Sequence, residues 1–227
     1  MTTPTDDPSA EETAKWLLAF AVGGGGADET VEALRPWAEA LARDGLDVEI
    51  EWLDALAHRR FTGSSEDPPF CAFVTIHADP AWAPTERGSP TEAPPSIFRL
   101  SAQPVFDRIE CEPGEPTPGL KKTTLWRARA DLTESGWHAR YAGHAELVPR
   151  AHASAWRYCQ NVIESAPAET TYHAVSELWW PTEADLLERF YASEEARALV
   201  AEDTQAFIDI PSAVQTVTRH QRLTRVG

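Results

Sequence analysis

The apolar and polar positions along the chain predict two successive sets of strands and helices. Short apolar runs bounded by turn residues indicate strands, and apolar residues spaced three and four apart indicate helices. In the first set we expect strands at residues 15–22, 46–53, 70–76 and 97–105 and a helix at 27–43 that ends at Gly45. Residues 79–96 are rich in Pro, Thr and Glu, so a loop is expected there in place of a second helix.

A segment rich in Pro and Gly separates the two sets. Residues 112–119 (EPGEPTPG) contain three prolines and two glycines and no core-forming side chain, which is typical of a linker. After it we expect strands at 121–132, 156–163, 172–180 and 214–223 and helices at 133–148 and within 182–208. The chain therefore divides into a disordered lead-in (1–13), an N-terminal half (14–111), the linker (112–119) and a C-terminal half (120–227).

The repeated order predicts an α+β fold made of two tandem βαββαβ units. Such a unit forms a four-stranded antiparallel sheet with helices on one face, and its other, apolar face needs a partner. The second half supplies that partner, so two sheets would pack face to face with helices outside. Residues 46–53 (LDVEIEWL) alternate apolar and acidic residues, as a half-buried strand does. A monomer that is internally a pseudo-dimer is expected, and a homodimer is the alternative.

Composition and charge narrow the possible partners. Hydrophobic residues make up 42% of the chain, and 36 acidic residues against 20 basic residues give a formal charge of -16. A phosphate backbone would be repelled by this charge, so no nucleic-acid partner is expected. No apolar stretch approaches the roughly 20 residues that a membrane span needs.

The cysteines and the first residues indicate a cytoplasmic protein. The first thirteen residues have neither the basic start nor the apolar run of a secretory signal. Cys71, Cys111 and Cys159 are odd in number and form no CxxC pair, so neither a disulfide framework nor a zinc ribbon is expected. His138, His144 and His152 lack the spacing of a helical metal pair, and the glycines at 23–26 lack the motif of a phosphate loop. We therefore expect no metal and no cofactor.

Four segments of the C-terminal half resemble the EthD family. They are WHARYAGHAELV (137–148), AWRYCQNVI (155–163), VSELWWPTEADLLERF (175–190) and SEEARALVAEDTQAFID (193–209). The resemblance implies a ferredoxin-like dimeric α/β-barrel with a pocket between helices and sheet. Members of this family look like accessory proteins of oxidative degradation or enzymes that shape aromatic and polyketide-like compounds. The first helix of the N-terminal half holds no His and no Tyr, so this half is interpreted as a degenerate structural copy.

One face of the helix at 133–148 carries the first candidate site. Trp137, Tyr141 and His144 are spaced i, i+4 and i+7 and so lie within about 60° of one helix face. In a cleft between helix and sheet, His144 could act as a general acid or base, Tyr141 could polarise a substrate oxygen and Trp137 could line the wall. The alternative is a core histidine bonded to a backbone carbonyl.

The strand at 172–180 carries a second candidate group. Period two places His173, Glu177 and Trp179 on one face. A carboxylate among aromatic residues would have a raised pKa and could pair with His173 as acid and base, while Trp179 would line the pocket. Alternatively, Glu177 satisfies a backbone or Arg donor in the barrel wall.

Three further residues are weaker candidates. Tyr158 and Asn161 could each bind a substrate oxygen, but they lie on opposite faces of their strand. The alternative for both is ordinary sheet packing. Asp203 is expected to hold Arg197 or cap a turn, with direct substrate contact as the less favoured reading.

The leading hypothesis is a cofactor-independent enzyme that acts on a small apolar, aromatic or polyketide-like compound by proton transfer, as in cyclisation, dehydration or isomerisation. A second hypothesis is a non-catalytic binding protein that holds such a compound for a partner oxygenase. A third is haem binding with His144 as the axial ligand.

Overall fold

The computed structural model describes residues 13–22, 26–84 and 88–224. In the N-terminal half, α2 (Ala55–Thr62) follows β2 (Asp47–Leu53), in a stretch for which no helix was predicted. It begins after Asp54, whose side chain accepts a hydrogen bond from the Ala57 amide at 3.0 Å, and it ends at Gly63 with φ of 69°. Between β3 (Ala72–Ala78) and β4 (Ser96–Asp107) the described residues form no α-helix, as expected. The elements are β1 (Ala14–Phe20), α1 (Ala27–Arg43), β2 (Asp47–Leu53), α2 (Ala55–Thr62), β3 (Ala72–Ala78) and β4 (Ser96–Asp107).

The C-terminal half has the order strand, helix, two strands, two helices, strand, which agrees with the predicted βαββαβ unit. The N-terminal half departs from that prediction, because its second helix comes before its third strand instead of after it. Its elements are β5 (Pro116–Ala128), α3 (Glu134–Ala151), β6 (Arg157–Ser165), β7 (Ala174–Trp180), α4 (Glu183–Glu188), α5 (Glu194–Gln205) and β8 (Ile208–Arg222). The single long helical stretch expected here is divided, because Thr182 and Ser193 each cap a new helix start. β5 begins inside the segment expected to be a linker, where Pro116 pairs with Gln221 of β8.

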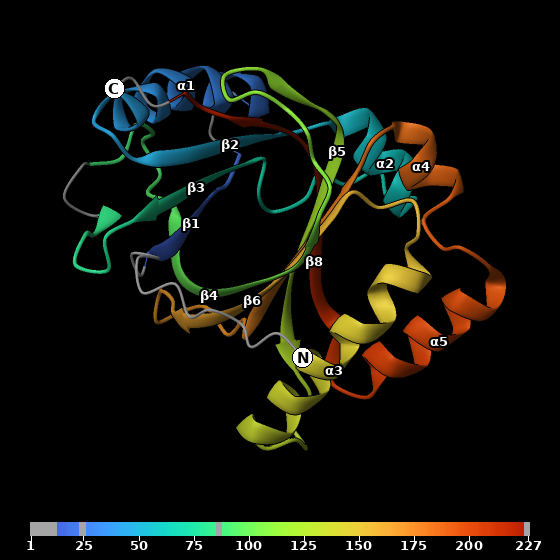
Figure 1. Cartoon of the computed structure of the whole chain (residues 1–227). Coiled ribbons are helices and arrows are strands. Elements are labelled where there is room, and N and C mark those ends of the chain that lie inside the picture. The colour runs from blue at the N-terminus through green and yellow to red at the C-terminus, as the bar shows by residue number, and fades with distance from the viewer. Residues whose placement is uncertain (1–12, 23–25, 85–87, 225–227) are drawn as a thin grey trace, which may run out of the picture.

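The eight strands close into one antiparallel barrel, which confirms the predicted fold class (Figure 1). Around the barrel the order is β1-β3-β2-β8-β5-β7-β6-β4. Each half therefore contributes four strands in the same internal order, fourth, first, third, second. The halves join through β2 with β8 and through β4 with β6. These equivalent junctions make the chain an intramolecular pseudo-dimer.

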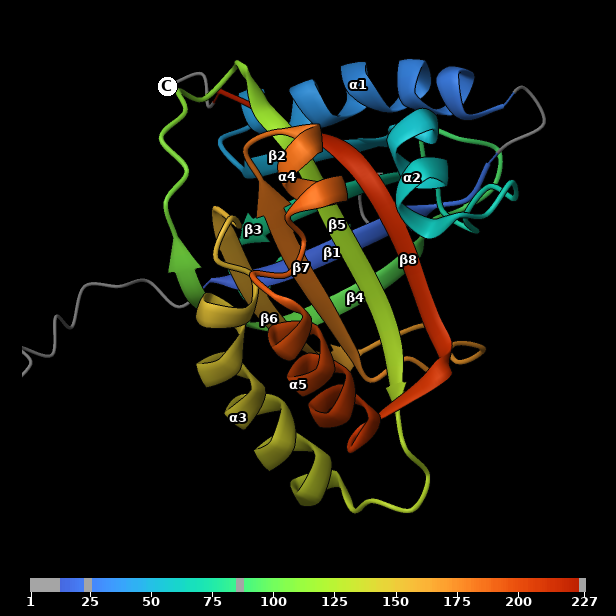
Figure 2. The ribbon, with the colours of Figure 1, turned by 90° about the vertical axis from the view of Figure 1, so that its right-hand side faces the viewer.

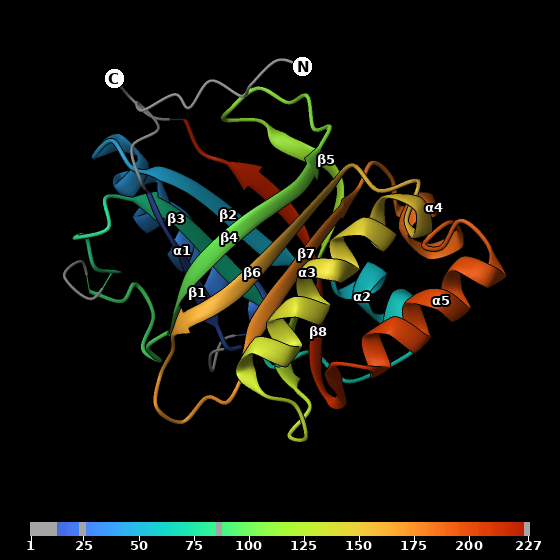
Figure 3. The same cartoon turned by 60° about the horizontal axis from the view of Figure 1, so that its bottom comes forward.

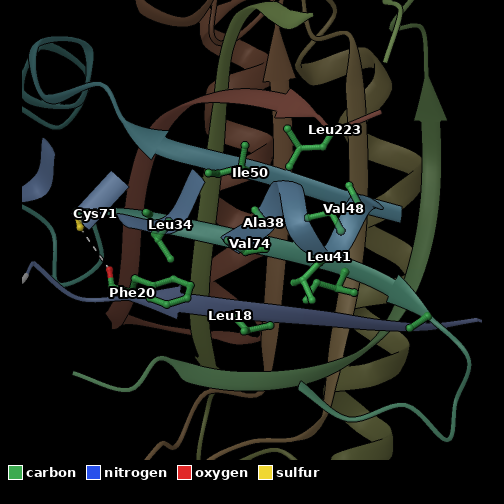
Figure 4. Packing of buried hydrophobic residues seen from close by; sticks show 14 residues of the cluster. Leu18, Phe20, Leu34, Ala38, Leu41, Val48, Ile50, Cys71, Val74 and Leu223 are labelled. Carbon is green, nitrogen blue, oxygen red and sulfur yellow. Dashed lines mark hydrogen bonds between the residues drawn. The ribbon is translucent and has the colours of Figure 1, made fainter. Parts of the chain in front are cut away.

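Helices cover the outside of the barrel on both halves. α1 lies across the N-terminal sheet, while α3 and α5 lie side by side over the C-terminal sheet (Figure 2). The core under α1 is apolar (Figure 4) and its buried members include Leu18, Phe20, Leu34, Leu41, Val48, Ile50, Val74 and Ile76. Burial of these side chains fixes α1 on the sheet by the hydrophobic effect.

The inside of the barrel is only partly apolar, which corrects the expected apolar interface between sheets. Glu49 and Glu51 of β2 are buried, and they face inward because Val48 and Ile50 face α1. Glu51 Oε1 accepts a hydrogen bond from Lys121 Nζ at 2.5 Å. The acidic positions of β2 are thus paired in the interior instead of solvated. One apolar layer remains, formed by Leu17, Ala19, Phe73, Phe98, Leu100, Leu125 and Val175.

Candidate functional site

A cavity of about 170 Å³ lies between α3, α5 and the outer face of the C-terminal sheet. The two helices run next to each other over this sheet (Figure 3). Aromatic and aliphatic side chains make up much of the wall, among them Trp126, Val148, Leu178, Phe190, Val200 and Phe207. Polar groups also line it, among them Lys122, Thr124, Tyr141, His144, His152, Tyr158 and Ser176. An apolar pocket with a few convergent polar groups is the usual form of a small-molecule site.

α3 presents one buried face to this region, as its spacing predicted. The helix starts at Thr133, whose hydroxyl accepts from the Gly136 amide at 3.2 Å. Trp137, Tyr141 and His144 are all buried. Tyr141 and His144 line the cavity, whereas Trp137 packs beside it against Trp126, with ring centroids 5.8 Å apart.

His144 forms a pair with Asp203 that bridges α3 and α5. Its Nδ1 lies 2.6 Å from Asp203 Oδ2. Since an ionised carboxylate can only accept, Nδ1 donates, and the lone pair of the neutral form of this imidazole is therefore on Nε2. The expected role of Asp203 in holding Arg197 is wrong, because Arg197 bonds Glu194 at 2.8 Å. The carboxylate instead fixes the orientation of the histidine ring, beside Phe207 at 5.7 Å between centroids.

The two tyrosines of the cavity have different surroundings. The Tyr141 hydroxyl is 3.2 Å from the Val175 carbonyl and 3.0 Å from Ser176 Oγ, and burial holds its pKa well above the usual value. Because this hydroxyl is already hydrogen-bonded to residues of β7, the geometry gives little support to the predicted polarisation of a substrate oxygen by Tyr141. Tyr158 Oη accepts from Gln160 Nε2 at 3.1 Å, and its ring lies 6.3 Å from that of His144.

Two cavity residues were not singled out as site residues from the sequence. His152 donates from Nδ1 to the Phe190 carbonyl at 2.6 Å, and burial lowers its pKa to about 4. It is therefore neutral near pH 7. Lys122 is half-buried, and its Nζ lies 5.6 Å and 5.3 Å from the ring centroids of Phe61 and Phe190. Alternation along β5 would have placed Lys122 on the face of Trp126, but it could not reveal which face meets α3.

Glu177 belongs to the barrel interior and not to the cavity. It binds Lys15 and Lys121, the latter at 2.5 Å, and accepts from Asn161 Nδ2 at 2.9 Å. Burial alone would raise the pKa of Glu177, but the ammonium groups of Lys121 and Lys15 outweigh it and hold the pKa well below its usual range. The expected raised pKa is therefore wrong. Trp179 lies in the same interior, with Lys121 Nζ 4.4 Å from its ring centroid.

Asn161 and Tyr158 occupy opposite faces of β6, as predicted. Asn161 faces the interior, where Lys15 Nζ donates to its Oδ1 at 3.0 Å, while Tyr158 lines the cavity. Of the four residues expected to bind substrate, only Tyr158 lines the cavity beside His144. Asn161 and Trp179 are separated from it by the sheet, and Trp137 lies behind Trp126.

His173 does not pair with Glu177, which corrects the expected acid and base pair. It precedes β7, where its Nδ1 accepts from the Ala128 amide at 3.2 Å and its ring packs 5.8 Å from Trp137. Both residues line a broader surface hollow of about 1010 Å³. Four charged groups of this hollow already form ion pairs, Arg129 with Asp131 at 2.8 Å and Arg127 with Asp209 at 3.3 Å. We therefore regard the smaller cavity, with its unpaired polar groups, as the candidate site.

The described residues offer neither a metal cluster nor a membrane-spanning helix. Across residues 13–22, 26–84 and 88–224, no group of three or more His, Cys, Asp or Glu side chains is placed to hold a metal ion. Within the same residues, no helix combines the length and apolar character needed to cross a membrane.

Comparisons with known proteins identify the architecture. No family model matches the chain, and no curated protein matches it. A solved structure of an anthrone oxidase-like protein aligns with a TM-score of 0.60 and 11% identity over 96% of this chain and 98% of its own. A candidate monooxygenase from Lactobacillus acidophilus NCFM aligns at 0.53 and 8% identity, over 95% and 97%. Another, from Fusobacterium nucleatum subsp. nucleatum ATCC 25586, aligns at 0.56 and 7%, over 93% of both chains.

These likenesses show the fold. The chain shares with all three an architecture that extends over nearly its whole length, and its own strands form a tandem α/β-barrel. At identities of 7–11% a shared fold does not determine the reaction, which depends on the residues of this cavity.

Proposed function

We propose that this protein is a cofactor-independent enzyme that removes a proton from a compact aromatic or polyketide-like compound bound between α3, α5 and the sheet. The single observation that carries the proposal is the His144–Asp203 pair at 2.6 Å on an otherwise largely apolar cavity. His144 Nε2 is the base, and Asp203 holds the ring in the tautomer that leaves this nitrogen unprotonated. The EthD resemblance of this half supports a site in the same place.

The cavity volume limits the ligand. An engineered apolar cavity of about 150 Å³ accommodates benzene, so about 170 Å³ suits a compound of one or two rings. Rings of Phe207, Tyr158 and Trp126 offer flat contacts to such a compound. Haem is far larger than this space, so the geometry does not support axial ligation by His144.

The proposed chemistry is a balanced proton transfer. His144 Nε2 takes a proton from an acidic C–H next to a carbonyl, and the electron pair of that bond moves to the carbonyl oxygen as an enolate. Return of the proton to another atom of the enolate completes an isomerisation. In a dehydration the enolate instead expels a hydroxyl group from the β-carbon, which takes the proton from His144 and leaves as water. General acid and base catalysis of this kind contributes about 10²- to 10⁴-fold in rate.

A second candidate is oxygenation of the same carbanion, which the descriptions of the structural neighbours favour. The carbanion carbon would bond to dioxygen, and protonation would give a hydroperoxide. Loss of water from it would convert the original CH₂ to C=O. Dioxygen is the oxidant, and uptake of it by an oxygen electrode distinguishes this outcome from proton transfer alone.

The test uses 2-tetralone, a two-ring ketone with an acidic CH₂, in deuterium oxide. Proton NMR measures the protein-dependent rate at which the CH₂ protons are replaced by deuterium. We expect exchange with the wild-type protein and a loss of about 100-fold or more in His144→Gln. The matched control is His138→Gln, because His138 lies on the same helix but outside the cavity.

Equal exchange in wild type and His144→Gln would contradict the proposal. Binding of 2-tetralone without any protein-dependent exchange would favour the non-catalytic binding protein instead. Thermal unfolding of each variant verifies that a loss of exchange reflects chemistry and not loss of the fold.

A further inference from the structure

Lys122 is a cation on the cavity wall without an acidic partner. Among the residues that the structure describes, no carboxylate lies within ion-pair distance of its Nζ and no hydrogen-bond acceptor is bound to it. Its neighbours are the rings of Phe61 and Phe190. The chain has 36 acidic residues, so the lack of one here is a local feature of this wall.

Thr124 adds a second unpartnered polar group on the same strand face. Residues two apart on a strand point to the same side, about 7 Å apart. Thr124 is 8% exposed, lines the cavity, and its Oγ1 has no hydrogen-bond partner. A buried hydroxyl without a partner is uncommon and destabilises the protein, because the group has lost its hydrogen bonds to water. Lys122 and Thr124 therefore present two unused donors to the same space.

The neighbouring lysine shows the opposite arrangement. Lys121 points into the barrel and binds both Glu51 and Glu177 at 2.5 Å. The lysine next to Lys122 in the sequence therefore has carboxylates that neutralise its charge, on the other face of β5. Burial without an opposite charge lowers the pKa of Lys122 to about 8, so the group is still largely protonated near pH 7.

We infer that Lys122 and Thr124 form an oxyanion site, and that the ligand of this cavity carries an acidic phenol or enol oxygen that binds as its anion. The inference rests on the proposed function and names its substrate class. The anion would replace the missing counter-charge of Lys122, and the Thr124 hydroxyl would donate a hydrogen bond to the same oxygen. In the proton transfer by His144, the enolate oxygen would be stabilised here.

The test is the ionisation of bound 4-nitrophenol, a one-ring phenol whose anion absorbs visible light while its neutral form does not. We expect the pKa of the bound phenol to fall by about one unit or more in the wild-type protein. We also expect the anion to bind about tenfold or more tightly than 4-nitrotoluene, which has the same shape without the hydroxyl. In Lys122→Met both effects should be lost, and in Thr124→Val the pKa shift should be reduced.

Each outcome bears on the inference. A bound phenol that titrates at or above its pKa in water, or an unchanged shift in Lys122→Met, would overturn it. Failure of both nitro compounds to bind would also overturn it, because the cavity would then be no ligand site. Deuterium exchange that depends on His144, without the phenol shift, would reject the oxyanion site alone. The shift without exchange would reject the proton transfer alone.

Discussion

At the scale of single residues, His152 makes stability depend on pH. Burial lowers its pKa to about 4, the bond to the Phe190 carbonyl opposes this in part, and Lys122 and His144 lower it further. Above pH 6.5, the ordinary pKa of a histidine, His152 is mostly neutral in both the folded and the unfolded protein, so it adds little pH dependence to the stability. As the pH falls from 6.5 to 4, the unfolded chain binds a proton that the folded chain does not, so stability is lost.

We therefore expect the free energy of unfolding of the wild-type protein to fall by roughly 3 kcal/mol more than that of His152→Gln between pH 6.5 and 4. Urea unfolding at several pH values measures this difference, in which the contributions of other groups largely cancel. Parallel curves for the two proteins would mean that His152 is not held neutral.

Residue spacing predicted part of the site. Helical periodicity alone placed Trp137, Tyr141 and His144 on one buried face, because 3.6 residues per turn fixes that relation. The partner of His144 could not be predicted, since Asp203 is 59 residues away and meets it only through the packing of α3 on α5. His173 was misplaced because it precedes β7, so strand alternation does not govern it.

At the scale of elements, β5 carries two adjacent lysines with opposite surroundings. Lys121 is buried between two carboxylates, and Lys122 has none. Removal of one member of a buried ion pair leaves a charge without a partner, whereas removal of an unpaired, half-buried charge relieves part of a desolvation cost.

We expect Lys121→Met to lower the free energy of unfolding by about 3–5 kcal/mol. Lys122→Met should leave it unchanged or raise it, because a desolvated charge without a partner is removed. Chemical denaturation of both variants measures the difference. A large loss of stability in Lys122→Met would indicate a structural role that competes with the oxyanion site.

The sequence predicted some helices more accurately than others. α1 was predicted with its full bounds because its apolar spacing is regular. α2 was missed since it has only eight residues, although its capping Asp54 and terminal Gly63 were readable signals. The break between α4 and α5 was also marked, by Ser193, which caps the start of α5.

At the scale of the whole molecule, the duplication and the barrel followed from the repeated element order, but the charged interior did not. The alternation of apolar and acidic residues in β2 is typical of a strand with one solvent-exposed face. Closure of the barrel turns that face towards the interior. Glu177 then joins Lys15 of the N-terminal half to Lys121 of the C-terminal half.

Glu177→Gln should therefore lower the free energy of unfolding by about 3–5 kcal/mol, since it leaves two buried lysines with reduced compensation. The matched control is Glu164→Gln, which breaks an exposed ion pair with Arg99 that also joins the halves. We expect a change of about 1 kcal/mol or less there. Similar losses in both variants would contradict the structural role of the interior network.

The central claim is that the cavity between α3, α5 and the sheet is the functional site, with His144 as its base. A crystal structure of the protein with 2-naphthol, which resembles the enol of 2-tetralone, tests it most directly. We expect the rings against Phe207 and Tyr158, the oxygen on Lys122 and Thr124, and a ring carbon facing His144 Nε2. A ligand bound instead in the surface hollow beside His173 would contradict the account.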